Sequence, residues 1–363
     1  MNDKFTVGIP VVSDDVKIWM VRTQSGRYYA DFVQNNYVAL GWDKINYKYL
    51  SKLQTKEAKN NYIKEIYPDE KRPGLILSQI ETFTEKIKPG DYIIIPSKGG
   101  GSVSLGIAND KVDKIQHVQR EEEYEVCNYK MKISVTWIKE IHTYQDVYLF
   151  KILRAVQTIS DVTKHKDLIL RNSYDLFISE DSIHLMLKKT THSPCMLENR
   201  LGFDSAIYTI FENANKLYGV KNQQIEYKTA ISSPGFIEII LPMSGSAMLL
   251  AMVVALTLKS KNTKDGVSFS GVSAIIKSIS DLFNDKVERD LKRKQIQKLD
   301  VEIESISIDN EIKKINLQNI QQGVIDSKNI TQQIEQISEE TKKLHSSAQN
   351  LGLSPISIQE KAG

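Results

Sequence analysis

The sequence predicts an α+β protein built from more than one folding unit, and three observations support this. The chain has 363 residues, more than a single typical domain, which favours two or three units. Short segments rich in β-branched and aromatic residues fill the first 150 residues, whereas residues 284–350 are polar with helical spacing. Eight of the nine prolines lie between Pro10 and Pro242, which leaves room for long helices beyond that point.

Residues 1–150 are predicted to form a β-rich first domain. Strands are expected at 17–23, 37–42, 90–96, 103–110 and 131–141. Helices are expected over 28–36 and 73–88, the second ending before the Pro89-Gly90 turn. Such helices would flank a curved sheet or barrel.

Residues 151–240 are expected to form a small α+β unit. Helices are predicted over 151–160, around 168–177 and over 205–219. Strands are predicted over 182–190 and 223–232.

Composition limits the class of protein. Hydrophobic residues make up 41% and charged residues 26%, which excludes a wholly disordered chain and a polytopic membrane protein. The net charge is only +3, so any affinity for nucleic acid must come from local patches. Cys127 and Cys195 are too far apart to suggest a disulfide framework or a zinc site, and the first residues lack the apolar stretch of a signal peptide. We therefore expect a cytoplasmic protein without a metal or cofactor.

The order of motifs in the first domain resembles a known family. The shared features are a strand with Trp19 and Arg22, a helix to Phe32, the Gly41-Trp42 pair, the turn Pro89 to Asp91, a strand with Gly106, and Trp137. Over residues 16–145 this order is similar to the PUA-like, EVE-related domain found ahead of Mrr-type restriction endonucleases and in other bacterial anti-phage defence proteins. The resemblance implies a small β-barrel with flanking helices that recognises nucleic acid, often through a modified base held in an aromatic pocket.

The resemblance also implies a set of ligand-binding residues. These are Trp19, Trp42 and Trp137 as stacking faces, with Arg22, Ser97 and Lys98 toward phosphate. Glycines in the loop from 97 to 102 would allow a phosphate to approach the backbone closely. The alternatives are core positions for Trp42 and Trp137 and a flexible hairpin tip for the loop. Trp19 and Arg22 lie three residues apart, on opposite faces of a strand.

The sequence holds one candidate catalytic triplet, which is of interest because the similar domain often precedes a nuclease. The nearest match to the Asp…Glu-x-Lys pattern is Asp204 with Glu226 and Lys228. Magnesium needs the two carboxylates side by side. Here a helix is predicted between them, where such nucleases have a strand hairpin. Enzyme activity is therefore the less favoured class.

Residues 239–258 form an uncharged run of twenty residues, long enough to cross a bilayer. Pro242 and the Ser-Gly-Ser sequence at 244–246 interrupt it, and the continuous part, 247–258, would span only about 18 Å as a helix. The region 241–283 is expected to hold this apolar helix and an amphipathic one. A buried core or oligomer helix is favoured, and a membrane-inserting segment is the alternative.

Residues 284–350 are predicted to form a coiled coil or helical hairpin, with a flexible tail over 351–363. Apolar residues recur in a three-four rhythm from Ile296 to Ile306 and again from Ile330 to Leu344. Their burial requires self-association or packing against the rest of the chain, so a homo-oligomer is expected. The residues proposed for phosphate or lipid contact are Arg289, Lys292, Arg293, Lys294 and Lys298.

These predictions give one favoured function and two alternatives. The favoured function is a bacterial defence-type sensor or adaptor that recognises nucleic acid or a nucleotide, oligomerises through its C-terminal helices and works with a neighbouring defence protein. The first alternative is a membrane-associated effector that inserts segment 239–258. The second is a divergent metal-dependent nuclease.

Overall fold

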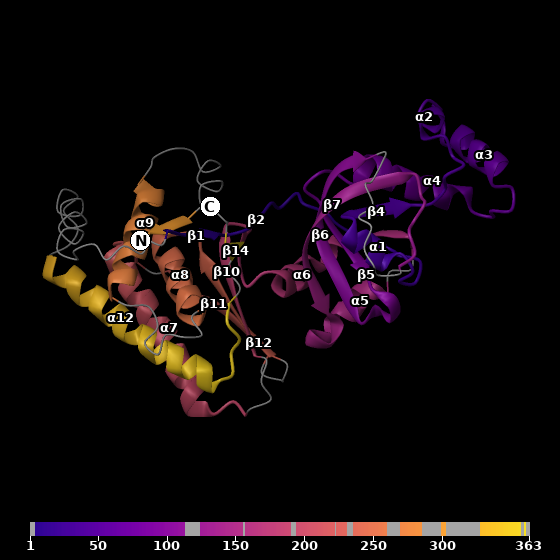
Figure 1. Cartoon of the computed structure of the whole chain (residues 1–363). Helices are drawn as coiled ribbons and strands as arrows, with labels where there is room; N and C mark the ends of the chain where they lie inside the picture. The colour runs from indigo at the N-terminus through magenta and orange to yellow at the C-terminus, as the bar shows by residue number, and fades with distance from the viewer. Residues whose placement is uncertain are drawn as a thin grey trace. The chain divides into compact units, whose positions relative to one another are not determined.

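The fold is α+β, as predicted, and is divided into two compact units (Figure 1). The computed structural model describes residues 4–112, 124–154, 157–189, 194–221, 223–230, 235–259, 269–284, 299–302, 327–356 and 359–360. The first unit is Asp15–Ser173, and the second joins Met1–Asp14 to Tyr174–Gly363. Residues 151–173 thus belong with the first unit, although the sequence suggested a border at 150.

A six-stranded sheet forms the centre of the first unit. Its strands are β3 (Ile18–Val21), β4 (Tyr37–Leu40), β5 (Tyr92–Pro96), β6 (Ser102–Val112), β7 (Met131–His142) and β8 (Ile159–Asp161). Their order is β4-β7-β6-β5-β3-β8, with only β3 and β5 parallel. The sheet curls into a half-barrel (Figure 1), and every residue of β3, β4 and β5 is buried. The five predicted strands of this unit are confirmed.

Helices flank this sheet, and the two that the sequence predicted are confirmed. They are α1 (Tyr29–Gln34) and α4 (Pro73–Glu81), the latter continued by the π-helical turn η1 (Thr82–Lys86). The sequence did not predict α2 (Tyr47–Leu50) and α3 (Lys56–Ile66). The unit also contains α5 (Phe150–Leu153) and α6 (Lys166–Ser173), and short 3₁₀ turns η3 (Thr143–Gln145), η4 (Val147–Leu149) and η5 (Thr163–His165).

The predicted helix over 151–160 is wrong in its second half. α5 ends at Leu153, and Ile159–Asp161 forms β8 instead. β8 is the edge strand and pairs with β3, where Val21 lies opposite Ile159, and this pairing buries Ile159. A contact between residues so distant in sequence overrides the local helical spacing.

The second unit contains a five-stranded sheet in the order β11-β12-β10-β9-β2. Its strands are β2 (Val11–Val12), β9 (Leu176–Ser179), β10 (Ser182–Lys189), β11 (Glu226–Ala230) and β12 (Gly235–Pro242). The strands are antiparallel except for β2 and β9. Glu180 and Asp181 both have positive φ and form the two-residue turn between β9 and β10, a geometry that matches the twist of a hairpin.

The helix α8 (Gly245–Lys259) lies at the centre of the second unit. It contacts β10 and β12 on one side and α7 (Leu197–Leu217), α9 (Phe269–Asn284) and α12 (Ser327–Asn350) on the others. Every residue from Gly245 to Ala255 is buried. A helix that is apolar all round is typical of such a core position. The favoured prediction of a core helix is therefore confirmed.

The uncharged run of twenty residues is shared between two elements. Its first residues, through Pro242, belong to β12, and α8 begins only at Gly245. No helix of the described residues is long and apolar enough to cross a bilayer. The length of the uncharged run is therefore explained by a buried strand followed directly by a buried helix.

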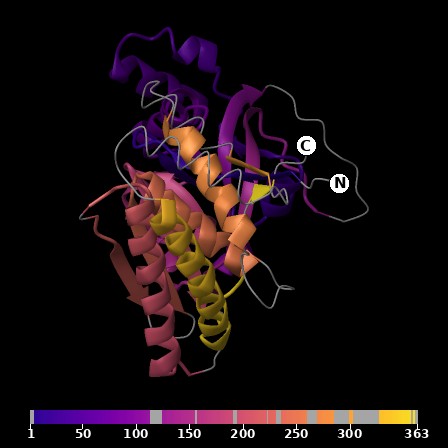
Figure 2. The ribbon, with the colours of Figure 1, turned by 90° about the vertical axis from the view of Figure 1, so that its left-hand side faces the viewer.

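The second isoleucine stripe of the tail packs within the chain. Ile330, Ile334, Ile337, Thr341 and Leu344 on α12 are fully buried. α12 and α7 run side by side (Figures 1 and 2). They approach closely at Gly202, where a Cβ atom would lie 2.9 Å from the Ser347 hydroxyl. These residues are buried by the same chain, so their burial does not require self-association. The homo-oligomer stays a prediction.

The rest of the predicted coiled coil is only partly described. Leu299–Glu302 is a strand, β13, and not the helix expected there; it pairs with β1 (Lys4–Gly8), which also pairs with β14 (Gln359–Glu360). The basic residues proposed for phosphate or lipid contact lie outside the described residues. They are Arg289, Lys292, Arg293, Lys294 and Lys298.

Candidate nucleic-acid interface

The three tryptophans predicted to stack on a base use their indole nitrogens within the fold. Trp19 is only 4% exposed, and its Nε1 donates to Asp91 Oδ2 at 2.9 Å. The Nε1 atoms of Trp42 and Trp137 donate to Gln79 Oε1 at 3.1 Å and to a main-chain carbonyl at 3.0 Å. Both half-buried rings pack against the hydrophobic core of the first unit. The three indole N–H groups are thus used within the fold, by Asp91, Gln79 and the carbonyl of Phe32.

The glycine loop between β5 and β6 is a defined hairpin turn. Ser97 Oγ accepts the main-chain N–H of Ser102 at 3.0 Å, so Ser97 shapes the turn. Gly99 and Gly100 have φ values of 72° and 73°, a region that favours glycine. Thr143 Oγ1 donates to the carbonyl of Gly100 at 3.0 Å, which ties the loop to the end of β7. Lys98 at the tip is exposed.

Arg22 positions α5 beside this loop. Its Nη2 donates to the carbonyl of Leu153 at 3.0 Å, and its main-chain N–H donates to Thr158 O at 2.8 Å. The Leu153 side chain in turn lies against the loop, since a Cβ on Gly100 would be 3.0 Å from Leu153 Cδ1. Arg22 therefore connects β3, α5 and the glycine loop.

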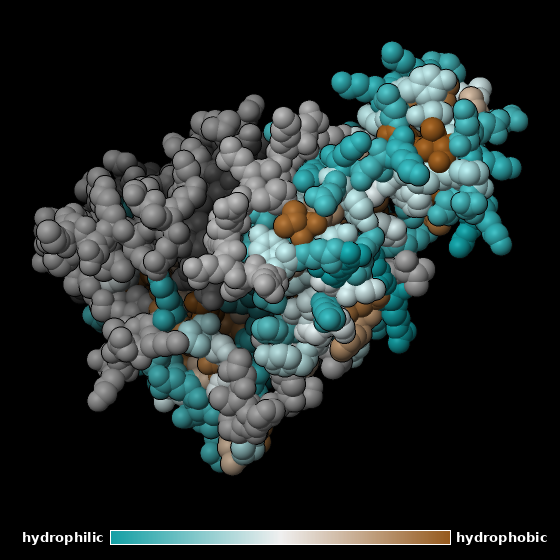
Figure 3. All heavy atoms as spheres, turned by 45° about the vertical axis from the view of Figure 1, so that its right-hand side comes forward, coloured by the Kyte–Doolittle hydropathy of each residue, from teal (hydrophilic) through white to brown (hydrophobic). Residues whose placement is uncertain are grey.

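Three exposed aromatic side chains follow β7 within seven residues of one another. Tyr144 is 68% exposed, Tyr148 52% and Phe150 48%. The Tyr144 ring stacks on His142, with centroids 5.3 Å apart and planes 14° from parallel. Lys151 Nζ lies 4.6 Å from the centroid of the Tyr148 ring. On the face drawn in Figure 3, hydrophobic residues lie in small separate groups. Three exposed aromatic rings on one short segment indicate a binding surface.

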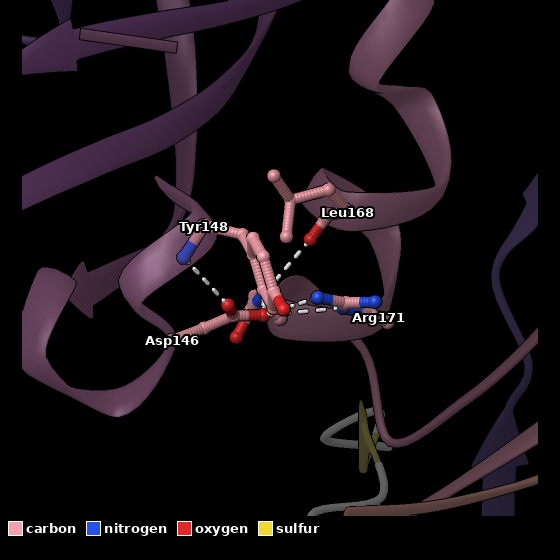
Figure 4. A network of polar contacts seen from close by, with 5 residues as sticks. Asp146, Tyr148, Leu168 and Arg171 are labelled. Carbon is pink, nitrogen blue, oxygen red and sulfur yellow. Dashed lines mark hydrogen bonds and ion pairs between the residues drawn. The ribbon is translucent and has the colours of Figure 1, made fainter. Parts of the chain in front are cut away.

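Asp146 anchors the aromatic segment to α6 (Figure 4). Its Oδ2 accepts Nη2 of Arg171 at 2.6 Å and Nδ2 of Asn172 at 3.0 Å, and its Oδ1 accepts the main-chain N–H of Tyr148 at 3.0 Å. The Asp146 side chain is 9% exposed, so this charge-assisted network is largely shielded from water. The main chain of the aromatic segment is therefore held against α6 at Asp146 and Tyr148.

Replacing Asp146 with Ala is expected to lower the free energy of unfolding by about 2–3 kcal/mol, because the partly buried ion pair with Arg171 and the hydrogen bonds to Asn172 and Tyr148 are lost. Asp146→Asn keeps an acceptor for Tyr148 and should cost less. Urea unfolding of the full chain, followed by circular dichroism, measures both. Unchanged stability in Asp146→Ala would show that the network does not hold the segment.

Exposed basic side chains accompany the aromatic rings: Lys151 lies against the Tyr148 ring, and Lys98 is on the loop that is tied to Thr143, next to Tyr144. Burial lowers the pKa of His165 below its ordinary value, and the positive charges of Lys164 and Lys151 lower it further. Lys151 and Lys164 are exposed, as is Lys98 on the adjoining glycine loop. We call this set the aromatic-basic surface. Its members are Lys98, Tyr144, Tyr148, Phe150, Lys151, Lys164 and His165.

The predicted nuclease triplet is not assembled. Asp204 on α7 accepts Arg200 Nε at 2.8 Å and the hydroxyl of Tyr227 at 2.7 Å. Glu226 and Lys228 flank Tyr227 on β11, so their side chains project from the opposite face of the strand, where they pair with each other at 3.2 Å. Among the described residues, no three His, Cys, Asp or Glu side chains are grouped to hold a metal.

The sequence interpretation missed the aromatic residues of this surface. A signal was present, because residues 142–150 hold three aromatics whose spacings, four residues and then two, fit neither a helix nor a strand throughout. Aromatic residues in an irregular segment have no periodic core to enter. Because a domain border was expected at 150 and a helix beyond it, these three aromatics were not interpreted as one surface.

The first unit is thus a half-barrel α+β unit with exposed aromatic and basic side chains on one anchored surface. A family model described as a domain of unknown function (DUF8426) matches residues 17–161, nearly the whole of this unit. No curated protein and no solved structure matches the chain.

Proposed function

We propose that the first unit binds nucleic acid through the aromatic-basic surface. The observation that carries the proposal is the group of exposed rings set among exposed lysines on a segment that Asp146 anchors. Lysines attract the phosphate backbone, and aromatic faces stack on bases. The resemblance of residues 16–145 to a PUA-like domain supports the same class of ligand.

The proposal places the protein among bacterial defence-type sensors or adaptors of the cytoplasm. The first unit recognises the nucleic acid, and the second unit signals this binding to a partner protein. The Asp204, Glu226 and Lys228 arrangement does not favour a nuclease, since Asp204 is bound by Arg200 and Tyr227. The burial of α8 does not favour membrane insertion.

Fluorescence anisotropy of a labelled single-stranded oligonucleotide, titrated with the full chain, tests the proposal. Tyr144→Ala is expected to weaken binding about tenfold, because stacking on one aromatic ring contributes about 1–3 kcal/mol. Tyr208 is the matched control, since this residue of α7 is also exposed, at 62%, but lies in the second unit. If Tyr144→Ala and the wild type bound the oligonucleotide with equal affinity, Tyr144 would not be part of the interface.

Binding is also expected to depend on pH through His165. Burial lowers the pKa of His165 below its ordinary value, so the ring is neutral at pH 7.5 and takes up a proton only at a lower pH than an ordinary histidine. The added charge should tighten binding to phosphate. The stability of the fold should decrease as the pH falls, because the unfolded state takes up this proton at a higher pH than the folded state.

Anisotropy titrations at pH 7.5 and at about pH 5.5, repeated with His165→Gln, measure this effect. The wild type should gain more affinity on acidification than the variant. The same gain in both proteins would show that other groups cause the pH dependence.

A further inference from the structure

A carboxylate stands at the edge of the aromatic-basic surface. Glu140 lies on β7, and its Oε1 accepts the Ser102 hydroxyl at 2.5 Å and the Tyr29 hydroxyl at 3.1 Å. The Tyr29 hydroxyl is also within 2.6 Å of Ser104 Oγ. Burial raises the pKa of Tyr29, so its hydroxyl remains a donor. These bonds hold the exposed Glu140 side chain in one orientation.

This carboxylate and the Tyr144 ring share one face of the sheet. The register is regular at this end of β7, where Ser104 is opposite Glu140 and Ser102 is opposite His142. Ile141, between them, is buried on the other face. Glu140 and His142 are therefore about 7 Å apart on the exposed face, and His142 is the ring on which Tyr144 stacks. Glu140 and the stacked pair of His142 and Tyr144 are thus neighbours along the strand.

A carboxylate in this place opposes the phosphate binding that the neighbouring lysines favour. It contributes to binding only if it accepts a hydrogen bond from a base. Cytosine presents an exocyclic amino group, a donor that carboxylates accept. Thymine presents one N–H between two carbonyl oxygens. A carboxylate is repelled by these two oxygens, so it gains little from the N–H. In a duplex the faces of each base are covered by stacking on its neighbours, so Tyr144 can stack only on an unpaired base.

We infer that the site takes unpaired bases and favours those with an exocyclic amino group, with Tyr144 as the stacking face and Glu140 as the acceptor. This inference rests on the proposed function. Glu140 then determines specificity, whereas Lys98, Lys151 and Lys164 bind phosphate whatever the base.

The test compares labelled oligo(dC), oligo(dT) and a mixed-sequence duplex of equal length, titrated with the full chain at pH 7.5. Oligo(dC) is expected to bind about tenfold more tightly than oligo(dT), since one good base contact is worth about 1–3 kcal/mol. Glu140→Gln keeps the shape of the side chain and should reduce this ratio to below about threefold, mainly by tightening binding to oligo(dT).

Glu57→Gln is the control, because Glu57 is an exposed carboxylate on α3 and its loss changes the net charge equally. It should leave the ratio unchanged. Equal affinity for both single strands, a preference for the duplex, or an unaltered ratio in Glu140→Gln would overturn the inference and leave nucleic-acid binding standing. Absence of salt-dependent binding to all three probes would overturn the proposed function itself. Thermal unfolding confirms that both variants are folded.

Discussion

Replacing Val253 with Asp is expected to unfold the second unit. Val253 lies in the middle of α8 and is fully buried between the sheet and the other helices. An unpaired carboxylate there costs about 3–5 kcal/mol or more, a large part of the stability of a typical domain. Circular dichroism of the full chain should show the loss of helix, whereas emission from the three tryptophans, all in the first unit, reports that unit separately.

Leu201→Asp is the matched control for this substitution. Leu201 lies on α7 of the same unit but is 59% exposed, so the charge remains hydrated and stability should change little. If Val253→Asp were as stable as Leu201→Asp, the central position of α8 would be wrong. A membrane-inserting segment predicts a different outcome, with loss of vesicle flotation and an intact fold.

Reversing the charge of Lys98, Lys151 and Lys164 together is expected to weaken binding to single-stranded nucleic acid by at least about 100-fold at low salt. The logarithm of the affinity falls with the logarithm of the salt concentration, and each lost phosphate contact reduces the magnitude of that slope by about 0.7. Loss of three contacts should therefore reduce it by about 2. Anisotropy titrations from low to physiological salt give both the affinity and the slope.

The control reverses Lys216, Lys221 and Lys342, which are exposed residues of the second unit. It makes the same change in net charge and should alter affinity only slightly. If both triple variants weakened binding equally, the effect would come from total charge and not from the aromatic-basic surface.

The sequence predicted the strands of the first sheet well because their signals are local. β5 is a run of isoleucines directly after a Pro-Gly-Asp turn, and β7 alternates buried and more exposed residues over much of its length. β8 was missed because its formation depends on pairing with β3, about 140 residues earlier in the chain. Residue spacing near Ile159 carries no information about that partner.

The site was predicted less well, for a physical reason. Tryptophan is the largest aromatic residue and an obvious stacking face, but a buried indole needs an acceptor for its N–H. Trp19 finds Asp91 and Trp42 finds Gln79, partners that only the folded chain brings near. The tyrosines at 144 and 148 are smaller, lie in 3₁₀ turns and remain exposed. Exposure is set by tertiary packing, which the sequence pattern does not show.

The uncharged run 239–258 shows the same limit. A buried strand and a buried helix in succession have the composition of a bilayer span. Pro242 and Gly245 are the local signs of the break between them, and the structure places the end of β12 and the start of α8 at these two residues.

Ultraviolet crosslinking of the full chain to a single-stranded oligonucleotide, with the modified residues mapped by mass spectrometry, tests nucleic-acid binding at the aromatic-basic surface most directly. The predicted result is adducts at Tyr144, Tyr148 or Phe150 that disappear at high salt and in the Lys98, Lys151 and Lys164 triple variant. Adducts confined to other parts of the chain, or none under conditions where anisotropy shows binding, would contradict the account.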